Sequence, residues 1–337
     1  MKSNVIGMDI AKLVFQLHTV DSNSGEIIRT KLRRAAVLPF FAQHAPVLVA
    51  IEACGSAHYW ARRLREFGHE VRLLAPKSVR PFVRSNKTDA ADAQAIWTAV
   101  QQPDARLVAI KTESQQAILT LHRMRAQLMK FRVMQTNALR GFLYEFGTVL
   151  PEGHRALAKA WPTALAALAE QLPGMLVDSL REQWLRVQQV DAEIAALERR
   201  LGSALRANEQ CRQIATIPGI GLLTATAVVA TIGDASTFRS GREFAAWLGV
   251  VPRQTGTGGR VRQLGLSKRG DTYLRTLLMH AARAIIARST RSPWVTGLLQ
   301  RRHYNVAVAA LANKLARTIW AVLAHDRPYD PAAFSAA

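Results

Sequence analysis

The apolar pattern of the chain changes its period near Thr112. Before this residue the apolar positions form short, strand-like runs, and after it they recur every three or four residues over two long stretches. A chain of 337 residues is long enough for about two domains, or three if a helical connector is counted. The change of period predicts an α/β domain over 1–111, a long helical coiled-coil segment over 112–205 and a mainly α C-terminal domain over 206–337.

The first domain is predicted to contain a mixed sheet. Residues 4–35 hold three short β-rich runs with a turn signal at DSNSG, which is typical of an antiparallel meander. The continuous apolar run 47–53 (VLVAIEA) predicts a buried strand, and a helical stretch (AHYWARRLREFG) and a short strand (HEVRLLAP) follow it. This order of elements is that of an RNase H-like α/β domain, in which the first and fourth strands are neighbours.

Two heptad patterns follow a capping box formed by Thr112 and Gln115. The first predicted seam consists of Leu121, Met124, Leu128, Phe131, Gln135, Ala138 and Phe142. The second consists of Leu180, Gln183, Val187, Val190, Ile194, Leu197, Leu201 and Ala204. Two such helices predict an antiparallel hairpin or a coiled-coil dimerisation arm, and two ordinary core helices are the alternative.

The C-terminal domain carries two patterns that favour contact with phosphate. PGIG lies between two apolar helical runs and resembles a helix-hairpin-helix, in which the backbone N–H groups at Gly219 and Gly221 approach a phosphate; a tight turn between helices is the alternative. Residues 253–275 hold five glycines and a single acid, Asp271, and are predicted to form a mobile cationic loop. Its basic residues are Arg253, Arg260, Arg262, Lys268, Arg269 and Arg275.

The charge of the whole chain points to the same kind of partner. Lys and Arg number 45 against 24 Asp and Glu, a formal net charge of +21, which favours a nucleic acid as the neutralising polyanion. A basic surface without a ligand is the plainer alternative. No stretch reaches about 18 uninterrupted apolar residues, so we expect no membrane partner and a soluble, cytoplasmic protein.

Four carboxylates are placed where they can act together. Asp9 interrupts the first strand, Glu52 ends the buried strand, and Asp89 and Asp92 lie three residues apart at the start of a helix, on one face. In an RNase H-like sheet all four converge, and hard oxygen ligands favour Mg²⁺, with Mn²⁺ as a substitute. The cysteines, Cys54 and Cys211, have no metal-ligand spacing, so the predicted metal is held by oxygen alone. Each acid taken singly also has a structural explanation, as a turn, strand-end or helix-start residue.

Six segments occur here in the order found in the DEDD-type, Piv-related insertion-sequence transposases, and the resemblance runs from Gly7 to about Arg317. They are GMDIAK, AIEACGSAHYW, SNKTDAADAQAI, TIPGIG, FAAWLGVVPRQ and GGRVRQLGLSKRGDTYLRTLL. The resemblance implies a RuvC-like domain whose metal-binding tetrad is Asp9, Glu52, Asp89 and Asp92. It also implies a coiled-coil segment, a C-terminal transposase domain and site-specific DNA recombination, with a structured bridge RNA as guide in some members.

In that family a serine in a P-R-x-x-x-S-G setting is thought to attack DNA. Here Pro252, Arg253 and Gly258 align with the pattern and place Thr257 where the serine is expected. The β-methyl of threonine stiffens χ1 and crowds an in-line attack, so Thr255 and Ser267 remain alternative nucleophiles.

Three functions are therefore open at this point. The first is a bacterial, nucleoid-associated recombinase that acts as a homodimer or tetramer on element ends and target DNA, with a guide RNA. The second is a hydrolytic RuvC-like nuclease, in which water attacks and no covalent protein–DNA species forms. The third is a basic nucleic-acid-binding protein without catalysis.

Overall fold

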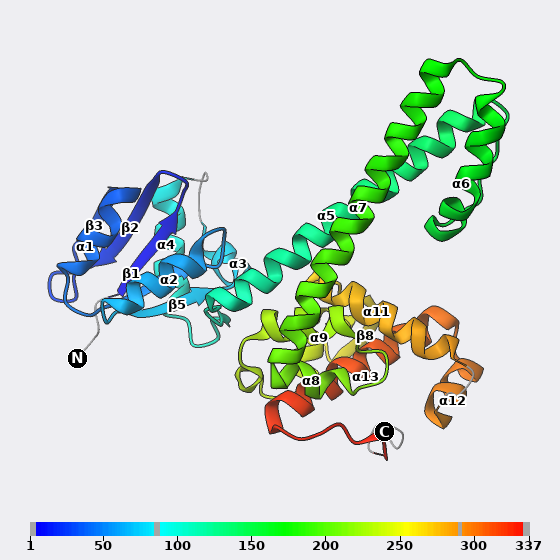
Figure 1. Ribbon diagram of the computed structural model, residues 1–337. Coiled ribbons are helices and arrows are strands. Elements are labelled where there is room, and N and C mark those ends of the chain that lie inside the picture. The colour runs from blue at the N-terminus through cyan, green and yellow to red at the C-terminus, as the bar shows by residue number, and fades with distance from the viewer. Residues whose placement is uncertain (1–4, 84–87, 289–291, 333–337) are drawn as a thin grey trace. The chain divides into compact units, whose positions relative to one another are not determined.

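The computed structural model describes residues 5–83, 88–288 and 292–332. The chain divides into two compact units, Met1–Ser114 and Gln115–Ala337 (Figure 1). The further division of the second unit at residue 205 stays a prediction.

The N-terminal unit is built on a six-stranded mixed sheet in the order β3-β2-β1-β4-β5-β6. The strands are β1 (Val5–Ile10), β2 (Val14–Val20), β3 (Ile27–Arg33), β4 (Leu48–Glu52), β5 (Glu70–Leu74) and β6 (Leu107–Val108). The first three form the predicted antiparallel meander, β4 is parallel to β1 and β5 is parallel to β4. The predicted adjacency of the first and fourth strands is thus confirmed, and the sequence analysis missed only the short β6, antiparallel to β5.

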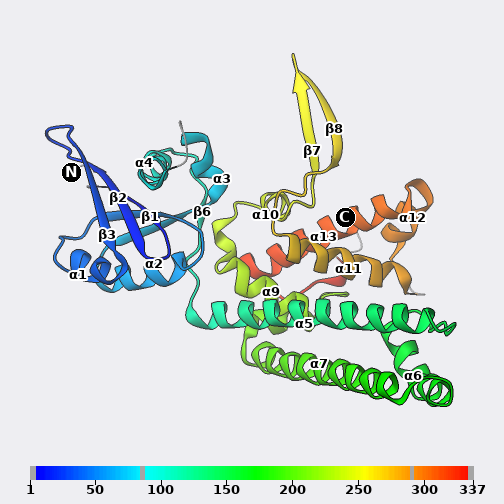
Figure 2. The ribbon, with the colours of Figure 1, turned by 90° about the horizontal axis from the view of Figure 1, so that it is seen from above.

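Helices cover both faces of this sheet, because its strands alternate which residues they bury. The helices are α1 (Val37–Ala42), α2 (Ala57–Glu66), α3 (Pro76–Val79) and α4 (Asp89–Val100), with 3₁₀ turns at Arg34–Ala36 and Arg80–Phe82. One core joins Met8 and Phe15 of the sheet to Trp60 of α2, and a second joins Ala50 to Ile96 of α4. Figure 2 shows α4 on one side of the sheet and α1 and α2 on the other.

The second unit begins with a helical hairpin. Its helices are α5 (Glu113–Tyr144), α6 (His154–Ala169) and α7 (Gly174–Ala207). The ion pairs Arg125–Glu198, at 2.7 Å, and Arg132–Asp191, at 2.9 Å, show that α5 and α7 run antiparallel. The predicted antiparallel arrangement is therefore present.

The buried positions agree with the predicted seam on α7 and differ from it on α5. On α7 the buried residues include Leu180, Val187, Ile194, Leu197 and Leu201. On α5 they are His122, Thr136, Leu139 and Leu143. The seam of α5 is thus displaced by one residue from the predicted 121/135/138/142 series, a rotation of about 100°. As a result Met124, Phe131 and Phe142 are 41–52% exposed.

A buried histidine explains this rotation, because its hydrogen bonds favour an inward orientation. His122 Nδ1 lies 2.9 Å from the Tyr273 hydroxyl, and Nε2 lies 3.0 Å from Thr226 Oγ1. Burial, with a smaller effect of Arg125, lowers the pKa of His122 to about 4, so the imidazole is neutral at pH 7. A seam predicted from apolar residues alone does not include a buried histidine such as His122.

The rest of the second unit is a helical core with one β-hairpin. Its elements are α8 (Glu209–Ala215), α9 (Leu222–Ile232), a 3₁₀ turn (Ala235–Thr237), α10 (Gly241–Leu248), β7 (Pro252–Thr257), β8 (Arg260–Leu266), α11 (Thr272–Ala287), α12 (Pro293–Arg301) and α13 (Tyr304–His325). Among the described helices, α13 alone is long and apolar enough to cross a membrane by length and composition. Half of its apolar window is buried, and residues such as Leu311, Leu315 and Ile319 belong to the core of this unit.

Candidate functional site

Three elements of the N-terminal unit carry the four predicted acids. Asp9 lies near the carboxyl end of β1 and Glu52 is the last residue of β4, which runs parallel to β1. Asp89 and Asp92 lie in the first turn of α4, where the Thr88 side chain caps the helix by accepting a hydrogen bond from the Ala91 N–H. Residues 85–87 of the motif that leads into α4 lie outside the described residues.

Gly7 allows α4 to come close to the acid-bearing strand. A Cβ built at Gly7 would lie 2.5 Å from the Ala93 carbonyl oxygen and 2.7 Å from Trp97 Cβ, so any side chain here would force the helix away. On the same face Trp97 contacts the ring of His18 at 5.5 Å between centroids. This close packing sets the start of α4, with Asp92, beside β1.

Electrostatics shows that the four acids form one cluster. The pKa of Asp9 is raised from 3.8 to about 6, first by burial and then by the negative charges of Asp92, Asp89 and Glu52. The Cys54 thiol, which the sequence analysis did not count as part of the site, also has a raised pKa because of burial and of Glu52 and Asp9. The sequence signal for it was its position two residues after Glu52 on the same strand end.

The donor chemistry of this cluster fits a hard divalent cation, although the side chains do not converge on one point. Within the described part of the chain, no group of three or more His, Cys, Asp or Glu side chains is arranged to hold a metal ion. Burial is the main cause of the raised pKa of Asp9, and the second cause is repulsion from the other three carboxylates, which a bound cation would relieve.

The predicted mobile basic loop is instead, over most of its length, an ordered β-hairpin. β7 and β8 pair antiparallel through a two-residue turn, Gly258–Gly259, whose φ angles of 55° and 77° require glycine. The alternation of small and β-forming residues in 252–266 indicated these strands. The sequence analysis overlooked it because the segment is rich in glycine. Only 267–271 remains a loop, between β8 and α11.

The hairpin places the candidate hydroxyls and arginines on one face. Thr257 is directly opposite Arg260, and Thr255 is directly opposite Arg262. Residues directly opposite each other in an antiparallel pair have Cβ atoms about 4.5–5.5 Å apart on the same side. All four residues are exposed, as are Arg253, Lys268 and Arg269.

The third candidate hydroxyl has a different environment. Ser267 lies beyond the end of β8, and its backbone N–H donates to the Val251 carbonyl at 2.9 Å. Its Oγ is buried and has no hydrogen-bond partner among the described residues. A DNA strand in solution can therefore reach the exposed hydroxyls of Thr255 and Thr257 more readily than the buried hydroxyl of Ser267.

The PGIG segment has a packing explanation for one of its two glycines. A Cβ at Gly219 would lie 3.0 Å from the Ala281 carbonyl and from Ile285, so this glycine allows α11 to approach. Gly221 has open space around it and is the N-cap of α9. A phosphate-binding helix-hairpin-helix stays a prediction.

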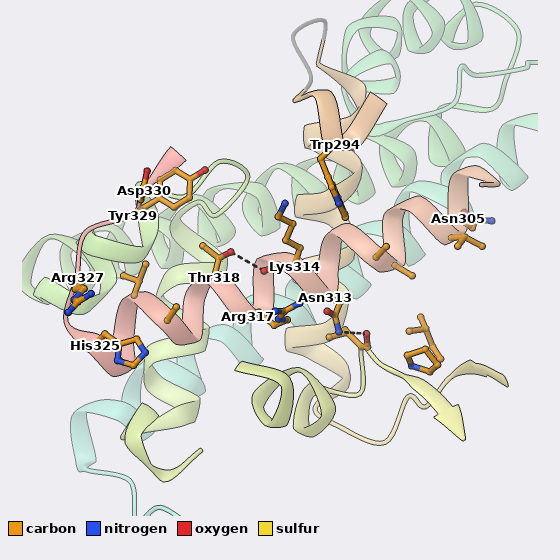
Figure 3. Close-up of a pocket in the computed structure, with 18 of the residues that line it drawn as sticks. Trp294, Asn305, Asn313, Lys314, Arg317, Thr318, His325, Arg327, Tyr329 and Asp330 are labelled. Carbon is orange, nitrogen blue, oxygen red and sulfur yellow. Dashed lines mark hydrogen bonds between the residues drawn. The ribbon is translucent and has the colours of Figure 1, made fainter. Parts of the chain in front are cut away.

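A groove lies elsewhere in the second unit. It has a volume of about 1010 Å³ and runs along α13 to the base of the hairpin (Figure 3). Lys314 Nζ lies 4.3 Å from the centre of the Trp294 ring, and Asn313 donates a hydrogen bond to the Val250 carbonyl at 3.2 Å. None of the predicted site residues lines this groove.

The fold and the acidic cluster together define a class of protein. A mixed sheet with helices on both faces and carboxylates at the ends of adjacent parallel strands is an α/β, nuclease-like domain, and the second unit is mostly helical.

Comparison with known proteins then gives the family. Residues 6–147 match the model of DEDD-type IS110 transposases, and residues 211–296 match the model described as "Transposase IS116/IS110/IS902 family". A probable family 20 transposase of Pseudomonas aeruginosa is 48% identical over 98% of this chain and all of that protein. The transposase for insertion sequence element IS1328 of Yersinia enterocolitica is 39% identical over 94% of this chain and 96% of its own length.

A more distant relative has a related activity in its name. The pilin gene-inverting protein of Moraxella bovis is 23% identical over 98% of each chain. The chain belongs to the IS110 family of insertion-sequence transposases. It is a DNA transposase and recombinase enzyme of that family.

The burial of Asp9, together with repulsion from the neighbouring acids, predicts a variant that gains stability at neutral pH. Because the folded state raises the pKa of Asp9 from 3.8 to about 6, it binds this proton more tightly than the unfolded chain does. The stabilisation is therefore complete below about pH 4 and is lost as the pH rises through 6. Asp9→Asn should gain about 1–3 kcal/mol at pH 7.5 and nothing at pH 4, as measured by hydrogen exchange of the sheet amides.

The exposed Asp104, in the same unit, provides the control. Asp104→Asn should have the same small effect on the free energy of unfolding at pH 4 and at pH 7.5. An Asp9→Asn gain that is the same at pH 4 and pH 7.5 would show that ionisation of the Asp9 carboxyl is not its cause.

Proposed function

We propose that this transposase cleaves and rejoins DNA through a covalent protein–DNA intermediate. Asp9, Glu52, Asp89 and Asp92 are assigned to bind Mg²⁺, with Mn²⁺ as a substitute, and Thr257 is assigned as the nucleophile. The observation that carries the proposal is that the other three acids all contribute to the raised pKa of Asp9.

The assigned step is a phosphoryl transfer. The Thr257 hydroxyl loses its proton and its Oγ bonds to phosphorus, the scissile P–O bond breaks, and the leaving oxygen takes up a proton. A bound divalent cation supplies charge stabilisation for the transferring phosphoryl group. Rejoining reverses the same exchange with a new DNA hydroxyl, so the phosphodiester energy is conserved.

The hairpin supports this assignment with a cation at the required place. Arg260 lies directly opposite Thr257, and a guanidinium binds the non-bridging oxygens of a phosphate in bidentate geometry. Arg253, Arg262, Lys268 and Arg269 are assigned to the neighbouring phosphates, since they are exposed in the same segment. Thr255 has its own opposite arginine and remains the second choice of nucleophile.

Replacing the hydroxyl should abolish the covalent species. On supercoiled DNA carrying the element ends, with Mg²⁺, Thr257→Ala should lower adduct formation by about 10³-fold or more, seen on denaturing protein gels. Thr257→Ser should keep the adduct, because it retains the hydroxyl and lacks the β-methyl. Thr255→Ala and Ser267→Ala are the matched controls and should still form it.

Two other outcomes correspond to the alternative functions. Cleaved DNA without an adduct, still dependent on Asp9 and Glu52, would establish the hydrolytic nuclease. Salt-dependent binding with no cleavage by any variant would establish a non-catalytic DNA-binding protein.

We also propose that a structured RNA guides the enzyme to its DNA, in the nucleoid of the bacterial cytoplasm. The support is the formal net charge of +21, since a structured RNA and DNA together present more phosphates for these cations than DNA alone does. Ribonuclease treatment of the purified protein should abolish cleavage of element DNA, and RNA transcribed from the element's end should restore it. Equal cleavage before and after ribonuclease would contradict guidance.

A homodimer or tetramer is proposed because recombination holds several DNA ends together. Met124, Phe131 and Phe142 leave apolar surface exposed on α5, which an interface would cover. Light scattering should give a mass two or four times 37.2 kDa, and Phe131→Glu should reduce it. A monomer both free and bound to nucleic acid would contradict this.

A further inference from the structure

The acid-bearing face of the sheet continues into a row of cations that the assigned site does not use. β3 is an edge strand of the sheet, beside β2 (Figure 1). Its alternate residues Arg29, Lys31 and Arg33 pair with His18, Gln16 and Val14 of β2. All three basic residues are exposed.

Strand register connects this row directly to the acidic cluster. Asp9 of β1 pairs with Gln16 of β2, and Gln16 pairs with Lys31 of β3. Directly paired residues lie on the same face of a sheet, so Asp9, Gln16 and Lys31 form one line across three strands. With strands about 4.8 Å apart, Lys31 begins about 10 Å from Asp9.

Packing confirms which face the cations occupy. Phe15, Leu17 and Leu32 pack in the core with Trp60 of α2, so the residues between them point to the other face, where α4 lies. His18, on that face, contacts Trp97 of α4. Arg29 is paired with His18 in the register and so lies on this face as well, and burial, followed by the positive charge of Arg29, lowers the pKa of His18.

The same face therefore changes from negative to positive over a short distance. Asp9 and Glu52 lie at the carboxyl ends of β1 and β4, with the first turn of α4 close by, and Lys31 and Arg33 lie two strands from β1 at the same end of the sheet. A DNA strand presents a backbone charge about every 3.4 Å along the helix axis, so about 10 Å corresponds to about three nucleotides.

We propose that Lys31, flanked by Arg33 and assisted by Gln16, binds the phosphodiester backbone within about three nucleotides of the scissile phosphate. The inference rests on the proposed function, because it takes the acids as the point where the scissile phosphate lies. Lys31 supplies the charge, and Gln16, between Asp9 and Lys31, supplies an amide donor for a phosphate or sugar oxygen. The row acts as a positioning site: it sets which phosphate of a bound strand reaches the acids.

A second explanation for Lys31 is that it protects a sheet edge. Natural edge strands often carry lysine to prevent pairing with another chain, and β3 also exposes Ile27 and Ile28. That role concerns aggregation and leaves DNA binding unchanged, so the two explanations give different results in a binding experiment.

The experiment is a chemical double-mutant cycle on the full-length protein. The proteins are wild type, Lys31→Ala, and Arg65→Ala as the matched control, since Arg65 is an exposed cation on α2, which packs against the opposite face. The DNA is a duplex element end with one uncharged methylphosphonate at each of the three phosphates on either side of the cleavage position. Affinity is measured over a range of salt concentrations, without any need for cleavage.

We expect Lys31→Ala to lower the slope of log affinity against log salt by about 0.9, the value for one lost phosphate contact. At one position, a methylphosphonate should weaken DNA binding by wild type and leave the affinity of Lys31→Ala unchanged. Arg65→Ala should behave as wild type with every DNA. Additive losses at every phosphate, an unchanged slope, or increased aggregation with unchanged affinity would each overturn the inference. Because binding is read without the covalent step, failure of the Thr257 assignment gives a separate result.

Discussion

The acidic cluster depends on the close contact between α4 and β1 at Gly7. Without a side chain at this position, the Ala93 carbonyl and Trp97 approach the strand, and the start of α4 comes beside Asp9. The helix carries Asp92 into the field of Asp9, while the parallel pairing of β4 with β1 brings Glu52 to the same end of the sheet. A side chain at Gly7 would force α4 away from β1, and this would both separate the acids and lower their repulsion.

Bringing the four acids together lowers the stability of the folded state. The pKa of Asp9 is raised because the folded state buries this carboxyl and, second, holds it near the negative charges of Asp92, Asp89 and Glu52. The two cores that enclose the sheet, one against α2 and one against α4, supply the compensating burial of apolar side chains. The hairpin β7–β8 differs, since both its strands are almost wholly exposed and a two-stranded ribbon is marginal in water.

Most strands and helices of the N-terminal unit could be predicted from the sequence, because alternating or continuous apolar runs and capped helix starts are local patterns. The meander, the buried strand ending in Glu52 and the helix starting at Asp89 were all predicted. It was wrong about the basic loop, where glycine content concealed a β-hairpin with a Gly258–Gly259 turn. It also placed the α5 seam one residue away, because His122 is polar and its hydrogen-bond partners, Thr226 and Tyr273, are about 100 and 150 residues distant.

The sequence by itself determined the type of most elements of the N-terminal unit, the family resemblance, the four acids and the strong positive charge, since these follow from local composition and order. Only the tertiary structure decided which residues meet. The register of β1, β2 and β3 aligns Asp9, Gln16 and Lys31, and the hairpin register sets Arg260 opposite Thr257. The physical reason is that strand pairing is fixed by side-chain packing between distant segments, and a shift of one residue would turn every one of these side chains to the other face.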